Sequence, residues 1–351
     1  MTKFKIQINQ YKQNHKMKKL FTYFLSTSFW LILASTTIFA LAADFRFVVM
    51  ADSRGSTNGV NVAELQTIMS RITTLNPQPQ FIIFPGDMIN GSSNAYATVS
   101  SQLQTWKNTV TAYKPASFFY PGVGNHETNN GAAYAAETAF NDLFPEFAVL
   151  DPLAGYNKTV YSFDYDNSRF IMLNSNHVGS GYNHKIDITQ QIWLQSKLTG
   201  KTHYFIFFHE PAYPTGGHIG SSLDTFPTER DAFWQILDNA NVTLVFVGHE
   251  HYYSRRHVDS SVNTTYHNYI YQVTTGTCGA PIYTNTNPSV DVPPIPQYHF
   301  AVVDVSGDNV SVTVYQDNGT LLDPFSTSRT IPTSCIDFWS IEHESLDSNS
   351  S

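Results

Sequence analysis

Val242-Thr-Leu-Val-Phe-Val-Gly-His-Glu-His251 joins a short run of apolar residues to a Gly-His-Glu-His tetrapeptide. An apolar run of this length, bounded by a glycine, predicts a buried β-strand. The same arrangement occurs four more times along the chain. The runs at residues 45–50, 81–84, 118–120 and 204–208 lead respectively to Asp52, to Gly86-Asp87, to Gly124-Asn125-His126-Glu127 and to His209. Five predicted strands therefore each end in side chains that can bind a metal ion or transfer a proton.

Helix-like stretches separate these predicted strands. Apolar residues recur near helical spacing at residues 60–75, 96–113, 132–143, 189–198 and 228–239. Strands that alternate with helices predict an α/β fold. In such folds, ligands gather outside the carboxyl ends of the strands. We therefore expect the polar residues of the five strand ends to converge on one site, although they lie far apart in the sequence.

The pattern changes after residue 265. Alternating polar and apolar residues at 269–274, 299–305 and 309–315 predict strands that extend the same sheets in antiparallel fashion. The proline-rich residues 281–296 are predicted to form a surface loop. No repeat or charge block divides this part of the chain. We therefore expect one domain over residues 43–330 and a separate tail at residues 331–351.

Residues 1–42 have the pattern of a targeting segment. Lys18 and Lys19 precede an apolar stretch at residues 20–42 that ends in Ala40-Leu41-Ala42, as in a secretory signal peptide. The stretch is also long enough to span a bilayer as an uncleaved anchor. Both alternatives predict export of the folded part, which would be secreted or periplasmic after cleavage and membrane-anchored without it.

Charge and cysteine content restrict the partners of the protein. The chain has 20 basic and 28 acidic residues, and residues 1–42 hold six lysines and no acidic residue. The remainder, with a formal net charge of −14, should repel nucleic-acid duplexes, whereas small phosphate compounds remain possible in a cleft that holds divalent cations. Cys278 and Cys335 either pair in an oxidising compartment or remain free thiols.

The polar residues at the five strand ends resemble a known family. Their order and type are similar to the motifs of the calcineurin-like metallophosphoesterases: Asp52, Gly86-Asp87, Gly124-Asn125-His126-Glu127, His209 and Gly248-His249-Glu250-His251. The similarity spans roughly residues 45–315, and residues 252–255 resemble the purple acid phosphatase branch. This resemblance implies a four-layer α/β/β/α sandwich, in which two mixed β-sheets are flanked by helices.

The resemblance also implies a centre of two metal ions. It places one ion on Asp87, Asn125, His209 and His249 and the other on Asp52, Asp87 and His251, so that Asp87 bridges them. Imidazole and carboxylate ligands suit Mn, Fe, Zn or Mg. His126 is expected to be catalytic, because in the family it faces the substrate and can protonate the leaving oxygen or stabilise charge on the phosphoryl group.

One motif departs from the family pattern. The family usually has Asp-x-His at the first motif, whereas this chain has Asp52-Ser53-Arg54, and a protonated guanidinium offers no lone pair to a metal. Arg54 is therefore expected either to bind a phosphate oxygen or to form an ion pair with a nearby carboxylate. Asn90 stands where purple acid phosphatases have a ligating Tyr, and it would either ligate the same ion weakly or orient His126. The missing nitrogen ligand favours manganese, magnesium or calcium over zinc.

These features predict an exported, metal-dependent phosphoesterase that hydrolyses a P–O bond by in-line attack of a metal-bound hydroxide. Phosphomonoesters are the first expected substrates, and phosphodiesters or nucleotides the second. His218 could reach the substrate from a loop, and Tyr253 and Arg255 could line the mouth of the pocket; otherwise all three are packing or surface residues. The alternative function is that of a non-catalytic relative that binds a phosphorylated ligand with an incomplete metal centre.

Overall fold

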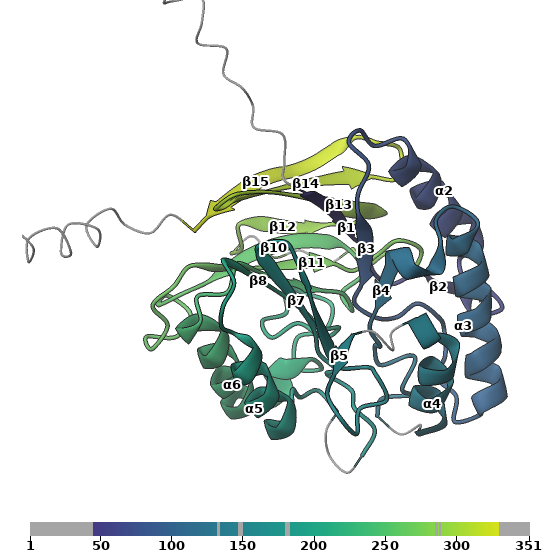
Figure 1. The fold of residues 1–351 in the computed structure, drawn as a ribbon, viewed down its shortest axis with the longest axis horizontal. Helices are drawn as coiled ribbons and strands as arrows, with labels where there is room; N and C mark the ends of the chain where they lie inside the picture. Colours follow the sequence, from purple (N-terminus) through teal and green to yellow (C-terminus); the bar gives the residue numbers. More distant parts are fainter. Residues whose placement is uncertain are drawn as a thin grey trace, which may run out of the picture. The chain divides into compact units, whose positions relative to one another are not determined.

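Two mixed β-sheets form the centre of the computed structural model (Figure 1). In spatial order, the first sheet consists of β15 (Leu321–Ser328), β14 (Asn309–Gln316), β13 (His299–Ser306), β1 (Phe45–Val49), β3 (Phe81–Phe84) and β4 (Phe119–Pro121). The second consists of β12 (Val292–Ile295), β10 (Tyr253–Val258), β11 (Ile270–Thr275), β9 (Leu244–Val247), β8 (His203–Phe207), β7 (Ser168–Met172), β6 (Tyr161–Tyr165) and β5 (Asp151–Pro152). Helices flank both sheets, so the expected four-layer α/β/β/α sandwich is confirmed.

The structure describes residues 45–131, 134–146, 150–179, 183–284, 287 and 289–329. The expected targeting segment, the expected tail and Cys335 lie outside these residues. Cys278 is a buried free thiol. Within the described ranges, no helix is long and apolar enough to cross a membrane.

Parallel strands in both sheets bring the polar motifs to one edge of each sheet. β1, β3 and β4 run parallel in the first sheet. In the second sheet, β7, β8, β9 and β11 run parallel. The five apolar runs of the sequence correspond to β1, β3, β4, β8 and β9. Because the carboxyl ends of parallel strands share an edge, each sheet presents its polar residues together.

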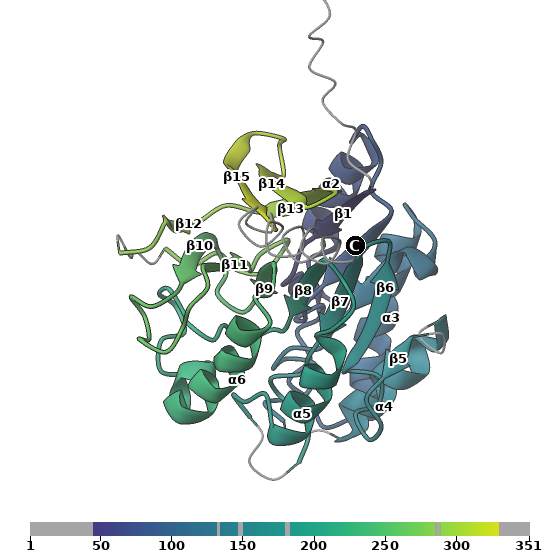
Figure 2. The ribbon, with the colours of Figure 1, turned by 60° about the vertical axis from the view of Figure 1, so that its left-hand side comes forward.

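Helices cover the outer faces of the sheets. The described helices are α2 (Val62–Thr73), α3 (Tyr96–Thr111), α4 (Tyr134–Leu143), α5 (Ile188–Lys197) and α6 (Pro227–Asn239), with the 3-10 helices η1 (Ala116–Phe118) and η3 (Leu223–Thr225). Helices α2 to α4 bury apolar residues in the core that contains the first sheet. Helices α5 and α6 lie side by side and pack on the second sheet (Figure 2). Asn61 and Asp187 cap α2 and α5 by accepting backbone N–H groups of the first turn.

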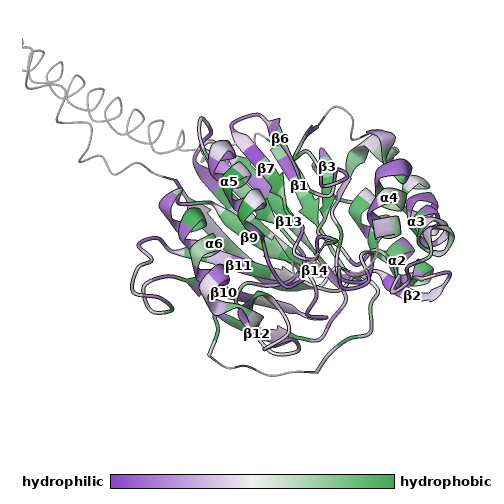
Figure 3. Ribbon diagram, turned by 90° about the horizontal axis from the view of Figure 1, so that it is seen from below, coloured by the Kyte–Doolittle hydropathy of each residue, from purple (hydrophilic) through white to green (hydrophobic). Residues whose placement is uncertain are grey.

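Aromatic side chains fill the space between the sheets. Phe47 of β1 stacks on Phe81 of β3 with ring centroids 5.5 Å apart. The same ring meets Phe170 and Phe205 of the second sheet edge-on, each at 5.1 Å. The hydrophobic colouring of β1, β3 and β9 in Figure 3 marks this apolar interior. Large buried rings of this kind contribute much of the stability of a core.

The antiparallel part of the first sheet joins the two ends of the domain. β13 runs antiparallel to β1, with Phe45 opposite Val305. Beside this pair, the guanidinium of Arg46 donates to both oxygens of Asp304, at 2.7 and 2.8 Å. β14 and β15 continue the antiparallel order. The expected extension is therefore present, although β11, from the predicted strand at 269–274, pairs parallel with β9 as well as antiparallel with β10.

One expectation for the C-terminal part was wrong. Residues 281–296, expected to form a loop, include the edge strand β12, which pairs with β10 and tolerates prolines because an edge strand leaves one side unpaired. Tyr253 and Arg255, for which a place at the pocket mouth and a packing role were both left open, contact Asp323 of β15. Its carboxylate accepts the Tyr253 hydroxyl at 2.6 Å and the Arg255 Nε–H at 2.8 Å. These buried contacts connect the second sheet to the first.

The variant Phe47→Ala is expected to lower the free energy of unfolding by about 3–5 kcal/mol, because it leaves a cavity where rings from both sheets meet. Denaturant titration followed by circular dichroism measures this loss. The control Tyr134→Ala removes a ring that is 65% exposed and should change the free energy of unfolding by less than about 0.5 kcal/mol. Equal losses in the two variants would contradict the assigned role of the inter-sheet core.

Candidate metal centre

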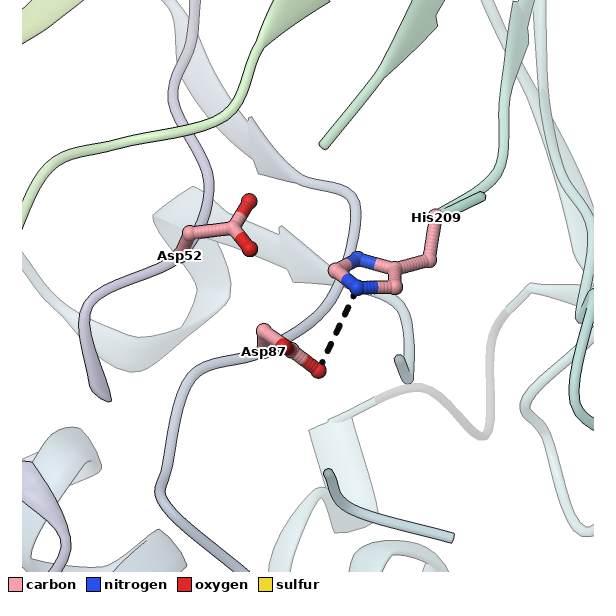
Figure 4. A group of neighbouring side chains, drawn as sticks. All are labelled: Asp52, Asp87 and His209. Carbon is pink, nitrogen blue, oxygen red and sulfur yellow. Dashed lines mark ion pairs between the residues drawn. The ribbon is translucent and has the colours of Figure 1, made fainter. Parts of the chain in front are cut away.

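Asp52, Asp87 and His209 form a buried cluster at the carboxyl ends of the strands (Figure 4). One potential ligand atom from each residue lies within 4.8 Å of the other two. Asp52 follows β1, Asp87 follows β3, and His209 follows β8 of the other sheet. The fold therefore brings these three predicted ligands together from both sheets.

Backbone carbonyls orient two of the histidines. The Nδ1 of His209 lies 3.0 Å from the Pro85 carbonyl, and the Nδ1 of His251 lies 2.7 Å from the Pro281 carbonyl. Because a carbonyl only accepts, each Nδ1 carries a proton, so Nε2 is the ring nitrogen that could bind a metal ion. The two Nε2 atoms face Asp87 and Asp52, at 3.3 and 3.5 Å respectively. Histidines that bind metals are held in this way, so the donor set fits a metal ion.

Asn125 and His249, the remaining ligands implied by the resemblance, lie beside this cluster. The Oδ1 of Asn125 is 3.2 Å from the Nε2 of His209. The ring of His249 meets that of His209 edge-on, with centroids 5.1 Å apart. Its backbone N–H donates to the two oxygens of Asp52, at 3.2 and 3.1 Å. Carboxylate, amide and imidazole donors together suit divalent first-row metals and magnesium.

The backbone turns sharply just after the strands, at the residues of the site. Asp52, Asp87 and His249 have positive φ values of 59°, 52° and 70°. A non-glycine residue in this left-handed region is less stable by about 1–2 kcal/mol. Such strain persists where the surrounding structure fixes it, and it is concentrated at functional sites.

Glycines next to the cluster leave room for its side chains, because they have no Cβ. Gly86 has a φ of +95°, and a Cβ there would lie 2.7 Å from the backbone nitrogen of Gly124 and 2.8 Å from the Nδ1 of His209. A Cβ at Gly124 or Gly248 would collide with the carboxylate of Asp87 or Asp52 respectively. The glycine in each of these motifs is therefore required by close packing around the ligands.

Burial and neighbouring charges shift the pKa values of the cluster in opposite directions. Burial raises the pKa of Asp52, because a carboxylate loses its hydration there. Burial acts in the same direction on Asp87, but the His209 and His126 imidazoles outweigh it and hold the pKa of Asp87 well below its usual value. Burial alone would lower the pKa of His209, but the carboxylates of Asp87 and Asp52 raise it to about 10. A metal ion that binds His209 therefore has to displace a proton.

His126 lies at the edge of the cluster with its ring held in place. Its backbone N–H donates to Asp87 Oδ1 at 3.1 Å. Its Nδ1 donates to the backbone carbonyl of Asn90 at 2.6 Å, and the Ser92 hydroxyl lies 3.0 Å from the same nitrogen. Its Nε2 is 3.9 Å from Asp87 Oδ2. This nitrogen is therefore placed to transfer a proton next to the potential ligands.

Three further predicted residues lie around the cluster. Asn90 is exposed, and its backbone carbonyl rather than its side chain orients His126. Arg54 begins β2 (Arg54–Thr57), and its Nε is buried without a hydrogen-bond partner. The ring of His218 stacks on that of His249 at 3.9 Å. Burial lowers the pKa of His218 to about 4, so its imidazole is neutral at neutral pH.

Three buried glutamates support the site, although the sequence motifs predicted no role for them. Glu127, Glu210 and Glu250 each directly follow a motif histidine, and none is exposed. The Glu127 carboxylate accepts backbone N–H groups of Asp87, Ile89 and Gly124, and that of Glu250 accepts those of Thr215, Gly216 and His218. The repeated His-Glu pair could have revealed them, since a charged residue beside a buried strand end requires polar partners.

Comparisons with known proteins support the fold and the domain. A model for the calcineurin-like phosphoesterase family matches residues 45–253. Purple acid phosphatase PPD1 from yellow lupin (Lupinus luteus) seeds is similar over 81% of this chain and 53% of its own, with 16% identity and a TM-score of 0.63. A dimetal phosphatase from Danio rerio is similar over 82% of this chain and 100% of its own, with 14% identity and a TM-score of 0.57. The chain thus spans about half the length of the lupin protein, and no curated protein matches its sequence.

The variant Gly86→Ala is expected to weaken metal binding by about 10–100-fold, because the new Cβ would displace the His209 ring or the Gly124 backbone. Metal content after dialysis and calorimetric titration with Mn or Zn measure this loss. The control Gly155→Ala has a similar φ of +90° but nothing within 4 Å of the new Cβ, so it reproduces the backbone strain without the collision. The explanation fails if the two variants retain metal equally.

Proposed function

Because the chain belongs to the calcineurin-like phosphoesterase family, we propose that it is a metal-dependent hydrolase of small phosphate esters. Phosphomonoesters are the first proposed substrates, and phosphodiesters or nucleotides the second. The observation that carries the proposal is the buried cluster of Asp52, Asp87 and His209, whose potential ligand atoms lie within 4.8 Å of one another. The acidic composition supports a small phosphorylated partner rather than a nucleic-acid duplex.

Two metal ions are proposed to bind in the centre. Asp87, Asn125, His209 and His249 would hold one ion, and Asp52, Asp87 and His251 the other. Bound ions of Mn, Fe, Zn or Mg would supply an activated water nucleophile and neutralise the charge of the phosphoryl oxygens. The orientation of His209 and His251, with Nδ1 on a carbonyl and Nε2 towards an aspartate, supports this assignment.

His126 is proposed to protonate the leaving oxygen. Water attacks phosphorus to form a new P–O bond and releases one proton to solvent, the ester P–O bond breaks, and the imidazolium form of His126 gives its Nε2 proton to the departing oxygen. The hydrogen bond from Nδ1 to the Asn90 carbonyl prevents the ring from turning over, which keeps Nε2 beside Asp87. A fixed ring lowers the entropic cost of reaching the transition state.

Arg54 is proposed to bind a non-bridging oxygen of the phosphate ester. The residue is only partly buried and lies two positions after Asp52 of the cluster, which places its positive charge near the site. A guanidinium matches the geometry of phosphate oxygens through two parallel N–H groups. The positive charge would favour the dianion of a phosphomonoester over the monoanion of a diester.

In the full-length protein, chelation followed by readdition of Mn, Zn, Fe or Mg is expected to restore hydrolysis of p-nitrophenyl phosphate, with slower turnover of bis-p-nitrophenyl phosphate. Asp87→Ala should lose bound metal and activity together. His126→Ala should keep its metal while kcat falls by about 10²–10⁴-fold, as expected for the loss of a general acid. The control His267→Ala changes an exposed histidine and should keep wild-type activity.

A folded wild-type protein that hydrolyses neither ester with any of these metals would overturn the proposed activity. The phospho-ligand binding protein would then become the better explanation. Calorimetry with inorganic phosphate would decide between that function and none at all.

We also propose that the protein is exported, because residues 1–42 carry the pattern of a signal peptide or anchor. N-terminal sequencing of the protein recovered from an expressing cell tests this. A start near residue 43 in the exported fraction is expected after cleavage, whereas an intact N-terminus in the membrane fraction would indicate an anchor. Recovery of the whole chain from the soluble cytoplasmic fraction alone would contradict export.

A further inference from the structure

Ser92 lies directly against the ring of His126, although no motif contains it. Its hydroxyl oxygen is 3.0 Å from the Nδ1 of His126, and the backbone carbonyl of Asn90 is 2.6 Å from the same nitrogen. Because the carbonyl only accepts, Nδ1 carries a proton, which the hydroxyl oxygen of Ser92 can accept as well. The carbonyl prevents the ring from turning over, and the second acceptor limits the tilt that remains.

The loop that carries Ser92 is fixed on two sides. The backbone N–H of Ser92 donates to the carbonyl of His126 at 2.8 Å, and the N–H of Gly91 donates to the side chain of Gln102 in α3 at 2.9 Å. A Cβ at Gly91 would lie only 2.0 Å from the carbonyl oxygen of His126, so the two segments are in close contact. The backbone therefore holds Ser92 beside the imidazole, and one side-chain torsion is left to place its hydroxyl.

The backbone conformation at Ser92 is one that a serine rarely adopts. Its φ is +49°, in the left-handed region, where a side chain is strained and glycine is not. A glycine at this position would relieve the strain, but it would also remove the hydroxyl from the His126 ring. Strained residues of this kind are concentrated at functional sites. The strain and the contact therefore point to the same residue.

We propose that Ser92 is a positioning residue for the general acid: its hydroxyl oxygen, together with the Asn90 carbonyl, fixes the His126 ring so that Nε2 faces the leaving oxygen. The inference rests on the proposed phosphoesterase function and adds a residue that acts only through His126. As the ester P–O bond breaks, the imidazolium gives its Nε2 proton to the departing oxygen, and Nδ1 keeps its proton. Ser92 therefore matters most for esters whose leaving oxygen has to be protonated.

The variants Ser92→Gly and Ser92→Ala test the inference in the metal-loaded full-length protein. Both remove the hydroxyl, but only glycine relieves the strain of the left-handed backbone. Both should lower kcat for phenyl phosphate by about tenfold, the effect of one lost hydrogen bond. The kcat for 2,4-dinitrophenyl phosphate, whose leaving group departs without a proton, should stay within about threefold. KM and metal content should not change.

Two further variants serve as controls. Ser92→Asn returns an oxygen acceptor on a residue that tolerates the left-handed region, and it should recover part of the kcat for phenyl phosphate. Ser70→Ala removes an exposed hydroxyl of α2 that lies 3.3 Å from the Tyr113 hydroxyl, and it should leave both kcat values unchanged.

Three results would overturn the inference while leaving the phosphoesterase function intact. The first is a wild-type kcat for phenyl phosphate in both Ser92→Gly and Ser92→Ala. The second is an equal fall of kcat for the two esters, or a loss of metal, because either would indicate general damage to the site. The third is a loss in Ser92→Ala that Ser92→Gly does not share, because it would assign the effect to backbone strain.

The wild-type rates test the proposed function separately. If the wild-type protein hydrolyses neither ester, the proposed function fails, and heteronuclear NMR of the histidine-labelled full-length protein then tests the positioning alone. The Nδ1 resonance of His126, identified by its absence in His126→Ala, should shift in Ser92→Gly because one of the two acceptors is lost. An unchanged resonance would overturn the role of Ser92 whatever the activity of the protein.

Discussion

A hydrogen bond between the two sheets holds the candidate metal centre together. The backbone N–H of His249, after β9, donates to the carboxylate of Asp52, after β1. A second link runs from the His209 ring to the carbonyl of Pro85, after β3. Neither sheet could build the centre alone, because each supplies only part of the donors. The aromatic core between the sheets sets their spacing, and the left-handed residues set the direction in which each strand end turns.

The parts of the fold that depend on local pattern could be predicted from the sequence. The five apolar runs match parallel strands because such strands are buried on both faces and read as continuous apolar segments. The strands β12 and β15 were missed for the opposite reason. Both lie at sheet edges, contain proline and carry partly exposed side chains, so their pairing depends on partners that are distant in sequence rather than on their own composition.

The candidate site could be predicted as a set of residue types but not as a geometry. The order of the motifs pointed to Asp52, Asp87 and His209, which the structure brings together. The orientation of His126 by a backbone carbonyl could not be read from side chains, because it depends on torsions fixed by tertiary contacts. No motif includes Ser92, and its hydroxyl meets the imidazole of His126 only when the loop after β3 folds back over the site.

The pairing of β1 with β13 decides when the centre can form. Asp52 leaves the ribosome early, yet the strand that leads to it gains its antiparallel neighbour only after residues 299–306 have been made. Until then one edge of β1 lacks its antiparallel partner, and an unpaired strand edge favours aggregation. During this interval, the potential metal ligands do not yet lie together in one site. The centre is therefore expected to form only after nearly the whole domain has been synthesised.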